Sequence, residues 1–226
     1  DYMVDLSVNL AGMQMDNPVV PASGTFGFGK EFKDIYDINI LGSFSFKGTT
    51  KDARFGNPTP RIAECTSGMI NAVGLQNPGV DHFIEKDLPW LKKQGTVIIA
   101  NIAGNTQEEY GQMAEKLSDT DIDMIELNIS CPNVKSGGVA FGTSCESVAN
   151  ITKYVRDHCK KPLIVKLSPN VTDIAEIAKS AEANGADAIS MINTLTGMRI
   201  DINTGRKLGF IKDIKATKIK HIKLEI

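Results

Sequence analysis

The chain has 226 residues, of which 42% are hydrophobic, and its formal net charge is −2. This composition excludes collagen-like, coiled-coil and wholly disordered proteins, and a chain of this length can bury a sizeable core. The near-neutral charge also argues against a nucleic acid or an anionic membrane as a partner, because either would favour a basic face. We therefore expect a small-molecule ligand, with no nucleic acid and no membrane partner.

The four cysteines are widely spaced and form no CxxC pair. In a chain of this length, such spacing favours reduced thiols over a disulfide framework, and neither the cysteines nor the three histidines predict a metal site. No apolar run approaches the roughly 18 residues of a membrane span, and the first ten residues lack the features of a signal peptide. These observations predict a cytoplasmic protein. The absence of an initiator Met suggests that the natural start differs from this one.

Short runs rich in Val, Ile and Ala predict buried parallel strands. In chain order they are Asn17–Ala22, Ile40–Phe46, Thr96–Asn101, Asp123–Asn128, Leu163–Leu167 and Ala186–Ile192. Amphipathic patterns between them predict helices, most clearly over Ser147–His158 and over Thr172–Asn184, which Gly185 terminates. This alternation indicates βα units and a parallel sheet.

Polar and small residues cluster directly after each predicted strand, in the runs SGTFG, KGTT, NIAGN, NISCPN, KLSPN and NTLTG. Ligand groups at the carboxyl ends of successive parallel strands are typical of a TIM (β/α)8 barrel, whereas an open doubly wound sheet has one switch point. The sequence therefore predicts a member of the TIM barrel class with about six of eight βα units recognisable. The segment Thr50–Pro78 is predicted to be a long excursion over the barrel mouth.

The end of the chain differs in character from the rest. Residues 1–209 are predicted to form an incomplete barrel domain. Residues 210–226 form an atypical tail with five Lys against Asp213 and Glu225, no glycine turn and no clear strand. A closed eight-stranded barrel would need two further βα units.

The most informative run is NISCPN, at residues 128–133. A cysteine between asparagines at a strand end can act as a base or nucleophile if its thiolate is stabilised, and the amides of Asn128 and Asn133 can bind a planar polar ligand. The alternative for Cys131 is a buried, inert thiol in a turn. Its polar neighbours favour the functional interpretation.

Two lysines and three loop residues are further candidates. Lys47 and Lys166 each end a predicted strand, where a lysine binds an anionic cofactor or a carboxylate, or forms a Schiff base; the alternative is a solvated surface lysine. Asn71 lies in a loop whose Gly74 permits close backbone approach to a ligand, although an ordinary turn has the same composition. Ser23 begins a glycine-containing run that suits a flavin or phosphate, or simply tight packing. No GxGxxG run follows a strand, so no nicotinamide site is expected within this chain.

These runs together resemble the class 1 dihydroorotate dehydrogenases, which are FMN-containing (β/α) barrels of pyrimidine biosynthesis. The resemblance extends from about Val4 to Gly209, with PASGTFGFG, FKGTT, NAVGLQNPG, ANIAGN, ELNISCPNVKSGG, IVKLSPN and MINTLTG in the family's order. Class 2 members carry a serine where this sequence has Cys131. The forms FKGTT, GLQNPG and VKSGGVAFG resemble the NAD-dependent subclass 1B rather than the fumarate-dependent subclass 1A.

The resemblance implies that Cys131 takes a proton from C5 of dihydroorotate while a hydride passes from C6 to N5 of FMN. Substrate contacts are implied at Lys47, Asn71, Val73, Gly74, Leu75, Asn128, Asn133, Asn193 and Thr194. FMN contacts are implied at Ala22, Ser23, Lys47, Gly48, Asn101, Asn128, Lys166 and Ile192. Among these, Lys166 is expected to stabilise negative charge on the reduced flavin ring.

Subclass 1B members pass their electrons to NAD through a separate subunit that carries FAD and a [2Fe-2S] cluster. The cysteines of this chain lack the grouping that such a cluster requires. The resemblance therefore implies a heterotetramer built on a catalytic homodimer.

Two alternatives remain open at this point. After Gly209 the family continues through two βα units that hold the FMN phosphate, whereas this sequence has the lysine-rich tail. An inactive, truncated remnant of the enzyme is therefore one alternative. A Schiff-base lyase that uses Lys166 is the other.

Overall fold

The computed structural model describes residues 4–66, 68–130, 141–200, 202 and 207–208. The chain divides into two compact units. The first comprises residues 1–55 and 75–195, and the second comprises residues 56–74 and 196–226. The predicted boundary at residue 210 lies outside the described residues.

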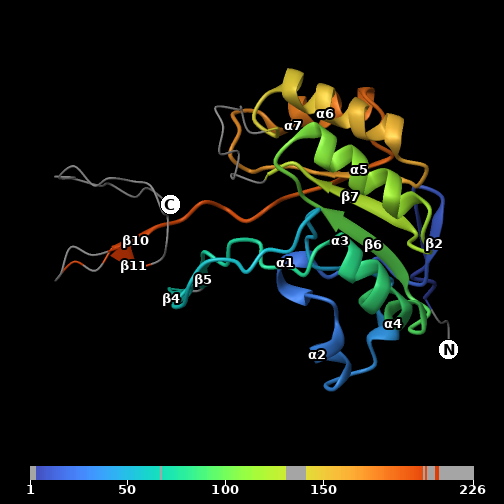
Figure 1. Cartoon of the computed structure of the whole chain (residues 1–226), viewed down its shortest axis with the longest axis horizontal. Coiled ribbons are helices and arrows are strands. Elements are labelled where there is room, and N and C mark those ends of the chain that lie inside the picture. The colour runs from blue at the N-terminus through green and yellow to red at the C-terminus, as the bar shows by residue number, and fades with distance from the viewer. Residues whose placement is uncertain (1–3, 67, 131–140, 201, 203–206, 209–226) are drawn as a thin grey trace. The chain divides into compact units, whose positions relative to one another are not determined.

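The first unit is built on a parallel sheet with the strand order β3-β6-β7-β8-β9 (Figure 1). Its strands are β3 (Ser43–Ser45), β6 (Val97–Ile102), β7 (Met124–Asn128), β8 (Leu163–Lys166) and β9 (Ala188–Ser190). Neighbours in the sheet follow one another along the chain apart from the excursion before β6, as βα crossovers require. This curled half-barrel confirms the predicted fold class, an incomplete TIM (β/α)8 barrel.

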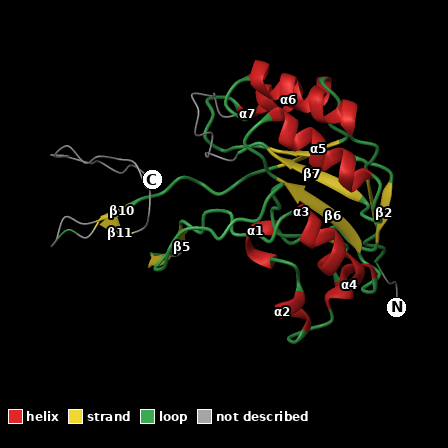
Figure 2. Ribbon diagram, viewed as in Figure 1, coloured by secondary structure: helices red, strands yellow, loops and turns green. Residues whose placement is uncertain are grey.

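Three helices lie along one face of this sheet: α5 (Gln107–Ser118), α6 (Cys145–His158) and α7 (Ile174–Ala183) (Figure 2). The side chain of Ser144 accepts a hydrogen bond from the backbone of Ser147 at the start of α6. Asp173 caps α7 in the same way, and Gly185 follows that helix with a φ of +105°. The two predicted helices are therefore confirmed, with Gly185 after α7 as expected, and their starts are set by the N-caps Ser144 and Asp173.

Shorter elements complete the first unit. They are β1 (Val8–Leu10), β2 (Met13–Met15), α1 (Ser23–Phe26), α2 (Lys30–Lys33), the 3₁₀ helix η1 (Ile38–Ile40), α3 (Val80–His82), the π-helix η2 (Phe83–Asp87) and α4 (Leu88–Lys92). Because η1 occupies the start of the strand predicted at Ile40–Phe46, β3 begins only at Ser43. The second unit contains two antiparallel pairs, β4 (Ile62–Cys65) with β5 (Gly68–Asn71) and β10 (Arg199–Ile200) with β11 (Lys207–Leu208).

The segment predicted as the first strand runs beside β3 without forming a regular ladder. Backbone N–H groups of β3 donate to the carbonyls of Val19 and Pro21. Pro18 and Pro21 have no N–H to return, and the N–H of Val19 donates to the side chain of Asn17 instead. The prediction of a regular strand over Asn17–Ala22 was therefore wrong.

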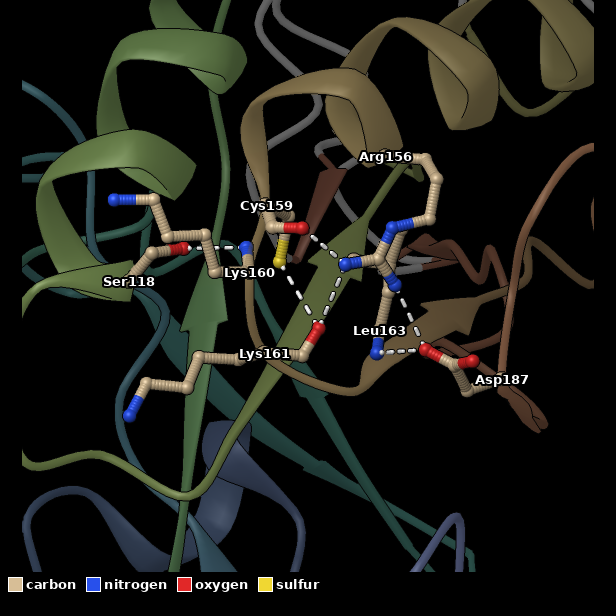
Figure 3. A network of polar contacts seen from close by, with 7 residues as sticks. All are labelled: Ser118, Arg156, Cys159, Lys160, Lys161, Leu163 and Asp187. Carbon is tan, nitrogen blue, oxygen red and sulfur yellow. Dashed lines mark hydrogen bonds and ion pairs between the residues drawn. The ribbon is translucent and has the colours of Figure 1, made fainter.

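A polar network fixes the end of α6 to the start of β8 (Figure 3). The guanidinium of Arg156 donates to the carbonyls of Cys159 and Lys161 and, at 2.8 Å, to the carboxylate of Asp187. Asp187 also accepts the backbone N–H of Leu163 at 2.7 Å. One cation thus holds the turn before β8 and the turn before β9 together.

Candidate active site on the inner face of the half-barrel

The sheet of the first unit has two chemically different faces. Alternate strand residues such as Ile98, Ala100 and Ile102 belong to the large apolar core beneath the helices. On the opposite face, Ile99 and Met124 belong to a second, smaller apolar cluster, against which the β1–β2 hairpin packs. We call this opposite side the inner face. It is apolar near the amino ends of the strands.

Toward the carboxyl ends of the strands, the inner face becomes polar. Asn101 of β6 pairs in register with Glu126 of β7. Asn128 of β7 pairs with Lys166 of β8, and Lys166 pairs with Ser190 of β9. Because neighbours in register lie side by side on one face of a sheet, four adjacent strands bring these polar side chains together. Three of the predicted site residues, Asn101, Asn128 and Lys166, are among them.

Glu126 is the centre of a buried network that the sequence analysis did not identify. Its Oε2 accepts hydrogen bonds from Ser45 Oγ at 2.6 Å and from Asn101 Nδ2 at 2.5 Å. All three residues are buried. A glutamate inside the apolar run Met124–Leu127 was the available signal, since a charged residue is rarely buried without a partner.

Asn101 has one hydrogen-bonding group without a partner. Its Nδ2 donates to Glu126, whereas its Oδ1 is buried and accepts no hydrogen bond within the part of the chain that the structure describes. A Cβ atom built on Gly48 would lie 2.8 Å from this Oδ1 and 3.1 Å from Leu75 Cδ1. Glycine at position 48 therefore lets the backbone lie close to the unpartnered oxygen, where a larger residue would clash.

Asn128 is held by three hydrogen bonds. Its Oδ1 accepts from Asn193 Nδ2 at 2.8 Å and from the N–H of Ser130 at 3.3 Å. Its backbone carbonyl accepts from the hydroxyl of Tyr110, a buried residue of α5, at 2.7 Å. Because Oδ1 is occupied, the group that the Asn128 side chain has available for a ligand is its NH₂ donor.

Lys47 follows β3 and is tied to the loop after the first predicted strand. Its backbone N–H donates to the carbonyl of Gly27 at 2.7 Å, and the N–H of Thr49 donates to the carbonyl of Asn101 at 2.9 Å. Four residues before Gly27, at the start of α1, Ser23 is buried, whereas its neighbour Ala22 is exposed. The backbone thus places Lys47 and Ser23 at the same edge of the sheet, although the Lys47 side chain itself is only half-buried.

The remaining residues that were predicted to contact substrate or FMN lie in different parts of the chain. In the first unit, Ile192 and Thr194 are exposed at the loop after β9. Asn71, Val73 and Gly74 belong to the second unit. There the backbone carbonyl of Val73 accepts the N–H of Asn57, and Gly74 has a φ of +76°. Cys131 and Asn133 lie outside the described residues, so their predicted roles stay predictions.

Within the ranges that the structure describes, no group of three or more His, Cys, Asp or Glu side chains is arranged to hold a metal ion. In the same residues, no helix is both long and apolar enough to cross a membrane.

Comparison with known proteins identifies the family. The dihydroorotate dehydrogenase family profile matches residues 5–221. The "dihydroorotate dehydrogenase B (NAD(+)), catalytic subunit" of Geobacillus kaustophilus is 55% identical over 204 residues, which cover 90% of this chain and 65% of that protein. The protein of the same name from Alkaliphilus metalliredigens is 58% identical over 200 residues, covering 88% of this chain and 66% of that one. The chain thus spans slightly less than two thirds of the length of these relatives, and it belongs to the dihydroorotate dehydrogenase family.

Proposed function

We propose that this chain oxidises (S)-dihydroorotate to orotate in de novo pyrimidine biosynthesis. The observation that carries the proposal is the polar inner face of the half-barrel, where Asn101, Asn128 and Lys166 lie at the carboxyl ends of adjacent parallel strands. That is where TIM barrel enzymes place their active sites. Family membership gives the reaction, because the similar proteins are named dihydroorotate dehydrogenase B catalytic subunits.

The residues of the inner face fit a flavin. The unpartnered Oδ1 of Asn101 is a buried acceptor without a donor among the described residues, and Gly48 lets the backbone lie close beside it. FMN, the flavin proposed here, supplies when bound the acceptor for the hydride that leaves C6 of the substrate. The residues proposed to hold it are Ala22, Ser23, Lys47, Gly48, Asn101, Asn128, Lys166 and Ile192.

The proton and the substrate are assigned to other residues of the chain. Cys131 is the proposed base, which removes the proton from C5 as the hydride leaves C6, so that two electrons and two protons leave the substrate. The Asn128 side chain offers its NH₂ to the substrate because its oxygen is already bonded. Lys47 offsets the charge of the substrate carboxylate. The remaining proposed substrate contacts are Asn71, Val73, Gly74, Leu75, Asn133, Asn193 and Thr194.

The printed name "catalytic subunit" of the similar proteins supports a partner subunit for this chain as well. We assign that partner the FAD and the [2Fe-2S] cluster that pass electrons on to NAD. The assembly proposed is a homodimer of this chain within a cytoplasmic heterotetramer.

The test is the visible spectrum of the 226-residue chain with FMN, recorded before and after anaerobic addition of dihydroorotate. The expected result is bound flavin that bleaches. Cys131→Ser should slow bleaching strongly at neutral pH, because a serine hydroxyl is a much weaker base than a thiolate. Cys145→Ser is the matched control, since Cys145 is exposed at the start of α6.

Two results would contradict the proposal. A folded chain that retains no flavin would support the inactive remnant. Retained flavin that dihydroorotate does not bleach would show that the site acts on another substrate.

A further inference from the structure

Glu126 is a buried titratable residue that the proposed reaction does not use. It is 5% exposed, and the bonds it accepts from the described residues come from the neutral donors Ser45 and Asn101. A buried carboxylate is costly unless hydrogen bonds stabilise it, so both donors are required to face it. Glu126 therefore restricts how these two neighbours are oriented.

The consequence for Asn101 is specific. An asparagine side chain has one accepting and one donating end, and either end can in principle face inward. A carboxylate accepts hydrogen bonds but, when ionised, donates none. Glu126 thus selects the orientation in which Asn101 turns its NH₂ toward β7, at 2.5 Å, and leaves its oxygen for another partner.

The selected oxygen is the one that the described residues leave without a donor. Asn101 is fully buried, and its Oδ1 lies directly beside Gly48. An unpartnered buried acceptor is costly, and a ligand that offers an N–H or O–H group at this point removes the cost.

We propose that Glu126 is a positioning residue, which holds the Asn101 amide so that its oxygen accepts a hydrogen bond from a donor group of the bound heterocyclic ligand. This inference rests on the proposed function for the identity of the ligand, FMN. The contact between Glu126 and Asn101 does not depend on that identity. The two parts are therefore tested separately.

The test exchanges the hydrogen-bond donor of residue 101 and the acceptor of residue 126 between these two positions. Asn101→Asp places two carboxylates against each other and removes the donor, so it should weaken FMN binding at pH 8 at least about tenfold. Adding Glu126→Gln restores the hydrogen bond in the opposite direction, because the new amide at position 126 donates to the new carboxylate at position 101. The second oxygen of that carboxylate then faces the ligand, where the amide oxygen of Asn101 lies in the unchanged chain. The double variant E126Q/N101D should therefore recover most of the lost affinity, whereas E126Q alone should not strengthen binding.

Thermal unfolding of the FMN-free proteins tests the contact itself. N101D should lower Tm and E126Q/N101D should recover at least half of the loss. The control N39D makes the same change of charge on the exposed residue Asn39 and should alter neither Tm nor FMN binding.

The outcomes are separable. If the double variant is as unstable as N101D, the contact is not the one described and the inference falls. If the double variant recovers its stability but not its FMN affinity, the oxygen of residue 101 does not face the ligand. The proposed positioning role of Glu126 is then wrong. If the unchanged chain binds no FMN, the proposed function fails and takes the ligand part of the inference with it, while the unfolding data still decide the contact.

Discussion

The Nδ2 of Asn193 lies 2.8 Å from the Oδ1 of Asn128 and joins the loop after β9 to the carboxyl end of β7. The contact thus links β7 to a segment that follows β9, a strand not adjacent to β7 in the sheet. The oxygen of Asn193 in turn accepts the backbone N–H of Thr194, so both ends of its amide are bonded, whereas Asn128 keeps its NH₂ donor available.

Removal of this contact should weaken substrate binding. In Asn193→Ala, Asn128 retains only the 3.3 Å bond from Ser130 to its side-chain oxygen, and its amide becomes free to turn. We expect orotate affinity, measured from the shift of the flavin spectrum, to fall roughly tenfold, the effect of about 1.4 kcal/mol or one hydrogen bond. The exposed Asn39→Ala serves as the control, and equal affinities in the two variants would show that the contact is not used.

A methyl group at position 48 should clash with the side chain of Asn101. The Cβ of Gly48→Ala would lie 2.8 Å from a buried polar oxygen, closer than packing allows, and should destabilise the chain by about 1–3 kcal/mol and reduce FMN affinity. Gly24→Ala is the matched control because a Cβ there meets nothing within 4 Å. Urea unfolding and FMN titration of both variants measure these effects. Wild-type FMN binding by G48A would disprove this role of Gly48.

Arg156 should contribute to stability and not to binding. Its replacement by Ala leaves the carbonyls of Cys159 and Lys161 and the carboxylate of Asp187 without their shared donor (Figure 3). We expect a loss of about 2 kcal/mol in the free energy of unfolding. Lys179→Ala breaks an exposed ion pair with Glu176 and should destabilise the chain far less. Similar urea midpoints for the two variants would contradict the prediction.

The Cys159 thiol should react slowly with alkylating reagents. Burial raises its pKa, and a hydrogen bond with the backbone of Lys161 opposes the shift only in part. Because the thiolate is the reactive form, the rate at Cys159 should rise only at higher pH than for an ordinary thiol. Iodoacetamide labelling of the folded chain, followed by peptide mass spectrometry, compares it with the exposed Cys145. Equal rates at about pH 8, near the pKa of an ordinary thiol, would show that Cys159 is accessible and its thiolate is not disfavoured.

The raised pKa of Cys159 also makes the stability of the folded chain depend on pH. The folded state keeps the Cys159 proton at a pH where the unfolded state loses it. The contribution of this group to the free energy of unfolding is therefore complete below the unfolded pKa and is lost as the pH rises through the folded value. Cys159→Ala should remove that part of the loss of stability above about pH 8.5.

Elements set by local sequence signals were predictable. The apolar runs of β6, β7 and β8 and the amphipathic, capped helices α6 and α7 lie within about two residues of their predicted positions. The segment Asn17–Ala22 has the apolar composition of a strand, but its two prolines lack the N–H groups that a ladder needs. Composition alone did not predict that the missing N–H groups would be needed for pairing with β3.

The candidate site was predictable only in part. Lys47, Asn101, Asn128 and Lys166 stand at strand ends in the sequence, so their place at one edge of the sheet follows from the barrel pattern. The bond from Ser45 to Glu126 joins residues 81 positions apart, and although Glu126 interrupts an apolar run, nothing in the sequence pairs it with Ser45. Such a contact depends on register between strands, which a single sequence does not fix.

The same separation has a consequence for the order in which the chain folds. Asn101 and Glu126 are 25 positions apart and Leu163 and Asp187 are 24 apart, whereas Ser45 and Glu126 are 81 apart. The entropy lost on closing a loop grows with its length, so the short βα segments should associate first and β3 should dock afterwards. Before that step, Glu126 has only one of its two donors, and the strand that leads into Lys47 is not yet in the sheet. We therefore expect the polar edge of the inner face to be the last part of the half-barrel to form. The ability to bind a ligand there would then appear only when folding is complete.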